Sequence, residues 1–139
     1  MLPAMGSLRT VNPHPGSTDC FEFIRAKLEN RRCTHTVCPQ QVETMVLPKR
    51  VISLADLTGT IRLLKPLQGQ TGKYAALSHY WRAHQPIRTT LSSLSSMKLA
   101  IPWTSLTSVF KDAIRVCKEA GITFLWIDSL CIVQDSVPD

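Results

Sequence analysis

The chain has 139 residues, 44% of them hydrophobic, which is enough for one modest domain with an N-terminal extension. Its net charge is +6, and the basic excess lies in residues 1–73, which carry ten Lys and Arg against five Asp and Glu. No basic run is longer than a pair and no aromatic residues alternate with the basic ones, so the composition argues against specific nucleic-acid binding.

The expected compartment follows from the cysteines and from the apolar runs. Five cysteines are an odd number, and Cys117 and Cys131 lie in apolar patterns where a free thiol behaves as a small hydrophobic residue. No apolar run approaches the roughly 18 residues of a membrane span, and the N-terminus has no secretory apolar core. We therefore expect a cytoplasmic protein without a membrane span.

The N-terminal part is predicted to hold a leader and one helix. Residues 1–17 contain three prolines and two glycines without a period, which predicts a disordered leader. Thr18 or Asp19 can cap a helix that ends near Asn30. Its apolar residues recur at helical spacing at Cys20, Phe21, Ile24 and Leu28.

A cysteine- and histidine-containing segment follows this helix. Cys33, His35 and Cys38 supply three closely spaced metal ligands, but a structural zinc site needs four and no fourth lies at a finger-like spacing. We interpret the segment as a loop, and we expect neither a metal nor another cofactor.

Two short β-rich runs come next, at residues 47–54 and 60–64, and the turn formers Asp56 and Gly59 lie between them. They predict a hairpin, and residues 73–78 then form a short apolar strand. The expected organisation is a leader (1–17), a segment with the N-terminal helix, loop and hairpin (18–65), and an α/β domain (66–139).

The strongest helix pattern begins at Thr104 or Ser105 and ends at Gly121. Its apolar positions are Leu106, Val109, Phe110, Ala113, Val116, Cys117 and Ala120. Before it, Leu91, Leu94 and Met97 are compatible with one or two helical turns. After it, the apolar run 122–127 fits a strand that is covered on both faces, as in a parallel sheet.

These elements predict an α/β fold with a partial parallel sheet and flanking helices. If strands 74–78 and 122–127 are parallel, their carboxyl ends share one edge of the sheet, where ligands of open α/β sheets bind. The candidate crevice is formed by Ser78, His79, Trp81, Asp128, Gln134 and Asp135. No catalytic residue can be named among them.

Two alternatives apply to this crevice. Ser78 and His79 are consecutive on a strand, so their side chains leave opposite faces and cannot form a Ser-His-Asp triad with Asp128. Asp128 can also be a structural carboxylate that caps the following turn through the amide of Ser129 or Leu130.

Four blocks of the sequence, in this order and spacing, resemble the fungal heterokaryon incompatibility (HET) domain. They are residues 74–81, Thr89-Thr90, residues 110–113 and residues 126–135, the last being nearly a complete match to the family signature. Upstream pieces, from Phe23 to Arg50 and at residues 61–63, resemble the lead-in common in such proteins. The resemblance covers most of residues 20–135.

The chain departs from the family pattern in two places. Arg82 stands where a glycine usually follows the tryptophan of the first block, and the sequence stops at Asp139 where the family domain continues. We therefore expect a truncated member of the family. One edge of strand 122–127 should then stay open and promote self-association.

The resemblance implies non-self recognition and programmed cell death in filamentous fungi, with other protein domains, including further copies, as partners. It also implies a fold similar to Toll/interleukin-receptor (TIR) domains, and hence an alternative function as an NAD-cleaving enzyme. The catalytic Glu of such enzymes lies on a helix after the second strand, beyond this chain, and Glu119 occurs too early. A third alternative is an inactive truncated paralogue, so an enzymatic role for this chain is disfavoured.

Overall fold

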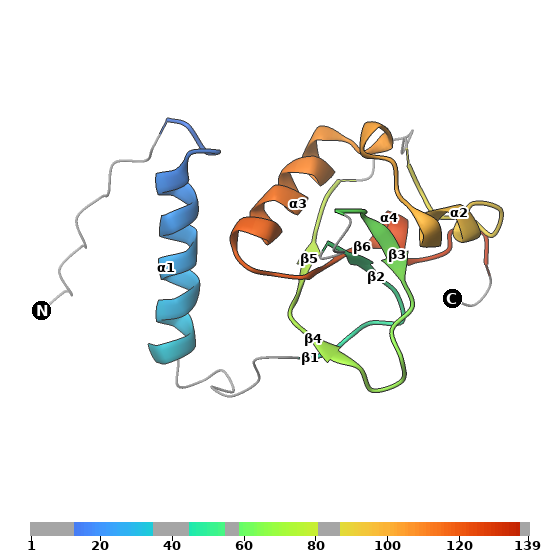
Figure 1. Cartoon of the computed structure of the whole chain (residues 1–139), viewed down its shortest axis with the longest axis horizontal. Helices are drawn as coiled ribbons and strands as arrows, with labels where there is room; N and C mark the ends of the chain where they lie inside the picture. Colours follow the sequence, from blue (N-terminus) through green and yellow to red (C-terminus); the bar gives the residue numbers. More distant parts are fainter. Residues whose placement is uncertain (1–12, 35–44, 55–58, 81–86, 137–139) are drawn as a thin grey trace, which may run out of the picture. The chain divides into compact units, whose positions relative to one another are not determined.

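A computed structural model describes residues 13–34, 45–54, 59–80 and 87–136 of the chain. The chain divides into two compact units, Met1–Cys38 and Pro39–Asp139, and each is considered by itself (Figure 1). Most of the predicted leader lies outside the described residues. The hairpin strands and the strands of the α/β domain belong to the same unit.

The first unit contains the predicted N-terminal helix, α1 (Thr18–Thr34). Its start is marked by Ser17, whose hydroxyl accepts a hydrogen bond from the Cys20 amide at 3.4 Å. The helix continues past Asn30, the predicted end, so Cys33 lies in its last turn rather than in a loop. His35 and Cys38 lie outside the described residues, within which no group of His, Cys, Asp and Glu is arranged to hold a metal ion.

The second unit is built on a four-stranded sheet with the order β3-β2-β6-β5. The strands are β2 (Val51–Ser53), β3 (Arg62–Leu64), β5 (Tyr74–Leu77) and β6 (Phe124–Ile127). β2 and β3 form the predicted hairpin, and β5 runs parallel to β6 with Leu77 opposite Ile127. A separate two-stranded ribbon pairs β1 (Met45–Val46) with β4 (Thr71–Gly72).

The prediction that one edge of strand 122–127 stays open is wrong. β2 pairs with β6 in the antiparallel direction, with Ile52 opposite Leu125, and the Leu54 amide donates to the Thr123 carbonyl at 3.0 Å. β6 therefore has a strand neighbour on both sides, β5 along Phe124–Ile127 and β2 at Phe124 and Leu125. The fold is mixed α/β, with one parallel and two antiparallel pairs in the main sheet.

Helix α3 (Ser108–Glu119) is the predicted long helix, but it begins later than Thr104 or Ser105. Residues Trp103–Ser105 form a 3₁₀ turn (η1), and Thr107 is the actual cap, accepting a hydrogen bond from the Phe110 amide at 3.2 Å. Gly121 ends the helix with φ +69°, a conformation in which a side chain is strained.

Fewer side chains of α3 are buried than its pattern of apolar residues predicted. Phe110, Ile114 and Cys117 are buried, whereas Val109 and Val116 are exposed, and Ile114 was not among the predicted apolar positions. Two short helices complete the unit: α2 (Leu94–Leu99), where one or two turns were expected, and α4 (Asp128–Cys131), which follows β6 directly.

The core joins residues of the main sheet and of the helices packed on it. It includes Ile52, Leu63, Phe110, Ile114, Leu125, Ile127, Leu130 and Cys131, all at most 3% exposed. Burial of a large aliphatic or aromatic side chain contributes about 1.5–3 kcal/mol, so the packing of α3 and α4 on β2, β3 and β6 is a main source of stability. None of the helices in the described ranges is both long enough and apolar enough to cross a membrane.

Candidate functional site

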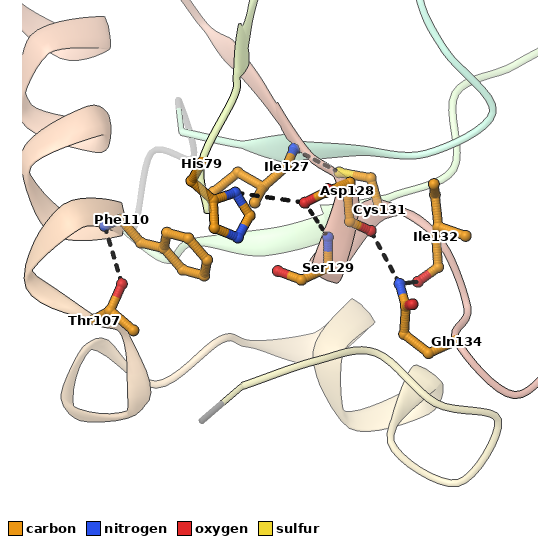
Figure 2. A network of polar contacts seen from close by, with 9 residues as sticks. All are labelled: His79, Thr107, Phe110, Ile127, Asp128, Ser129, Cys131, Ile132 and Gln134. Carbon is orange, nitrogen blue, oxygen red and sulfur yellow. Dashed lines mark hydrogen bonds and ion pairs between the residues drawn. The ribbon is translucent and has the colours of Figure 1, made fainter. Parts of the chain in front are cut away.

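The parallel register brings His79 and Asp128 together at the carboxyl ends of β5 and β6, as predicted from the two strand ends. His79 Nδ1 lies 3.5 Å from Asp128 Oδ1, and the two side chains are 8% and 31% exposed. The edge of the Phe110 ring of α3 packs against the imidazole, with 5.0 Å between ring centroids and an interplanar angle of 89°. The imidazole is thus held between a carboxylate and an aromatic ring (Figure 2).

Asp128 also caps the turn that follows it. Its Oδ1 accepts a hydrogen bond from the Ser129 amide at 2.7 Å, which matches the structural alternative for this carboxylate. The same oxygen therefore faces both the imidazole of His79 and the first amide of α4. Asp128 couples the end of β5 to the turn after β6.

Ser129 adds a buried hydroxyl to this pair. Its side chain has no exposed surface, and its Oγ has no hydrogen-bond partner among the residues that the structure describes. Figure 2 shows the hydroxyl directed toward the side on which the His79 and Phe110 rings lie. A serine, a histidine and an aspartate thus meet here, but a fully buried serine cannot attack a substrate from solvent, and the group does not form a hydrolase site.

Thr89 holds the segment after residue 86 against this turn. Its hydroxyl donates to the Leu130 carbonyl at 2.6 Å, and its amide donates to the Ser129 carbonyl at 2.9 Å. Its own carbonyl accepts from the Gln134 amide at 2.9 Å. Thr89 is fully buried, so all three contacts are shielded from water.

Gln134 and Asp135, both in the predicted crevice, act on backbone groups. Gln134 Nε2 donates to the carbonyl oxygens of Asp128 at 3.1 Å and Ile132 at 2.9 Å. Asp135 Oδ1 accepts from the Leu91 amide at 2.7 Å. Both side chains fix the loop after α4 instead of facing His79.

Arg50, the residue directly before β2, contacts the same turn. The sequence did not predict this contact. The buried guanidinium donates through Nε to the Cys131 carbonyl at 2.8 Å, and burial lowers the pKa of Arg50. Burial also raises the pKa of the Cys131 thiol to about 12, so this thiol is neutral and unreactive at neutral pH.

The remaining predicted residues stand apart from this cluster. The Ser78 side chain is exposed, and Trp81 lies outside the described residues. Thr89, Ser129 and Arg50 were not predicted as site residues. All three do fall in segments that carry the family resemblance, and this was the one signal that could have drawn attention to them.

A separate pocket of about 420 Å³ lies away from the cluster. It is lined by Gly59, Thr60, Ile61, Ile101, Trp103 and Lys118. It includes none of the six residues of the predicted crevice.

These features define a mixed α/β domain in which a buried polar cluster ties the ends of a parallel strand pair to the next turn. Residues 74–139 match the family described as Heterokaryon incompatibility protein (HET), which supports the resemblance found in the four sequence blocks. No curated protein and no solved structure matches the chain.

Proposed function

We propose that the chain acts in fungal non-self recognition and programmed cell death as a heterokaryon incompatibility domain protein. The observation that carries the proposal is the family match over residues 74–139, which begins at β5 and includes every element of the His79–Asp128 cluster. The partners that we propose are other protein domains, including further copies of this chain.

The cluster supports a role in signalling more than one in catalysis. The side chains of Thr89, Asp128 and Gln134 bond to backbone groups, and Ser129 has no exposed surface. Such a network holds the turn after β6 and the loop after α4 in one conformation, and a preformed conformation favours binding of a protein partner. The TIR-like fold and an NAD-cleaving activity stay predictions that no feature of the cluster favours.

Asp128 is the residue whose loss tests the proposal. Inducible expression of the chain in a filamentous fungus should cause cell death, measured by uptake of a membrane-impermeant dye. Asp128→Ala should abolish death, because it removes both the contact to His79 and the cap on Ser129. Asp19→Ala is the matched control, since Asp19 is an exposed carboxylate in the first turn of α1.

Killing by the Asp128→Ala protein at a normal protein level would contradict the assigned role of the cluster. An absence of death with the unsubstituted chain would contradict the proposed function itself. Light scattering of the purified chain tests self-association, and a monomer at micromolar concentration would exclude a second copy as partner.

A further inference from the structure

The pocket that lies away from the His79–Asp128 cluster has the size of a small-molecule site. Its volume of about 420 Å³ falls within the range of roughly 300–1,000 Å³ that is typical of ligand pockets. Its lining comes from three places in the chain: the residues that lead into β3, the residues around the start of η1, and the last turn of α3. The pocket has no part in the function proposed above.

Two buried isoleucines form the apolar part of the lining. Ile61 is 7% exposed and Ile101 is 4% exposed. The Ile101 amide donates to the Ile61 carbonyl at 2.7 Å, so the two segments that carry these side chains are joined directly. The pocket therefore has an apolar base that a backbone hydrogen bond holds in place.

An indole ring adds an aromatic surface to this base. Trp103 begins η1, where its carbonyl accepts a hydrogen bond from the Leu106 amide at 3.2 Å, and its side chain is 46% exposed. The ammonium group of Lys111 lies 5.7 Å from the centroid of the Trp103 ring, a cation–π contact that holds the indole against α3. A half-exposed ring in a fixed orientation is a surface on which a planar ligand can stack.

The charge within the pocket has one sign. Lys118 is the one charged residue among the six that line it, and it forms no ion pair within the part of the chain that the structure describes. Its neighbour Glu119 does not line the pocket, and Asp56, the nearest acid before Gly59, lies outside the described residues. A ligand that complements this lining combines an aromatic ring with an anionic group.

We propose that this pocket binds a small aromatic carboxylate, with its ring stacked on Trp103 above Ile61 and Ile101 and its carboxylate paired with Lys118. A neutral ring would leave the ammonium group without a partner in the pocket. A polyphosphate needs several cations, whereas the lining supplies one. The combination of one aromatic side chain, an apolar base and one lysine thus selects a planar monoanion.

The test is titration of the full-length chain with 2-naphthoate and with 2-naphthamide, its neutral analogue of the same shape, followed by ligand-observed NMR. The amide should bind about three- to fivefold more weakly than the carboxylate. Lys118→Met keeps an unbranched side chain and removes the charge, so it should weaken 2-naphthoate by the same factor and leave 2-naphthamide unchanged. Lys98→Met is the matched control, because Lys98 is an exposed lysine in the last turn of α2, as Lys118 is in α3.

Trp103→Ala should weaken both ligands by at least about fivefold, because it removes the stacking surface. Lys118 is exposed, so Lys118→Met should keep the circular dichroism spectrum and urea midpoint of the parent and tests the proposal independently of Trp103→Ala. Asp56→Asn should not weaken 2-naphthoate binding.

Failure of 2-naphthoate to bind at millimolar concentration would overturn the proposal, as would equal binding of the carboxylate and the amide. Weaker binding with Asp56→Asn, or equal losses with Lys98→Met and Lys118→Met, would do the same, since the carboxylate would then not be held by Lys118. None of these results depends on the proposed role in cell death.

Discussion

Asp128 Oδ1 is the atom on which the cluster depends, because it faces both the His79 imidazole and the Ser129 amide. A carboxylate oxygen has room for two such contacts, and each is stronger for the negative charge. Thr89 has a comparable role: its hydroxyl and its amide both donate to carbonyl oxygens of α4, and so connect the segment after residue 86 to this helix. These two residues fix the turn by different means, one by charge and one by burial.

Replacement of Thr89 by Val should destabilise the chain by about 1–3 kcal/mol, because the isosteric side chain leaves the buried Leu130 carbonyl without its donor. Urea unfolding followed by circular dichroism measures the change. Thr89→Ser keeps the hydroxyl and should cost less than Thr89→Val. Equal losses for the two variants would mean that the methyl group, not the hydrogen bond, stabilises the turn.

The proximity of two residues was predictable from the sequence where each residue directly follows one of two parallel strands. The rule that parallel strands share a carboxyl edge placed His79 beside Asp128. The roles of Thr89 and Arg50 depend on contacts with residues 41 and 81 positions away, for which a single sequence carries no local signal. The sequence does not indicate that the Ser129 hydroxyl is buried, which only the packed structure shows.

At the scale of elements, Gly72 controls how closely β4 approaches β6. A Cβ at this position would lie 2.7 Å from a ring carbon of Phe124 and 3.3 Å from a methyl group of Leu47. The backbone of β4 therefore touches the aromatic ring directly. This contact joins the β1–β4 ribbon to the main sheet.

Gly72→Ala should destabilise the chain by about 1–3 kcal/mol, since the Phe124 ring must move to admit the methyl group. The loss should shrink when Phe124→Leu is introduced first, because the shorter side chain leaves room. Urea unfolding of the two single variants and the double variant gives the coupling between the sites. Additive losses would show that the ring is not what Gly72 accommodates.

Elements with strong local patterns were predicted well. The hairpin, the parallel pair and α3 each followed from apolar period or from turn residues. The pairing of β2 with β6 was missed. About seventy residues separate the two strands, and the residue pattern of a strand does not indicate which other strand pairs with it. The start of α3 was also misplaced, since Thr104, Ser105 and Thr107 are all plausible caps and only Thr107 makes the hydrogen bond.

At the scale of the whole molecule, the thiols make stability depend on pH. Burial raises the pKa of Cys131 to about 12 and also raises that of Cys117. Below pH about 8.5 both thiols are protonated in the folded and the unfolded chain, so they add no pH dependence. Above that pH the unfolded chain releases the protons and the folded chain keeps them, so the free energy of unfolding falls as pH rises.

Between pH 7 and pH 10, Cys131 alone should lower the free energy of unfolding by about 1–2 kcal/mol. Urea unfolding at both pH values measures the change. Cys131→Ala should reduce the difference between the two pH values, whatever it does to stability at pH 7. Cys33→Ala, at an exposed position, should leave the difference unchanged, and an equal effect of the two substitutions would rule out burial as the cause.

The position of β6 between β2 and β5 has a consequence for how the chain is made. Both of its neighbours are synthesised long before it, because β2 ends at Ser53 and β5 ends at Leu77, whereas β6 begins at Phe124. Until the ribosome has released residue 127, the earlier strands lack the one partner that joins them, and their apolar faces stay uncovered. The four-stranded sheet can therefore form only after β6 has been synthesised, and the apolar faces of the earlier strands are open to misassociation until then.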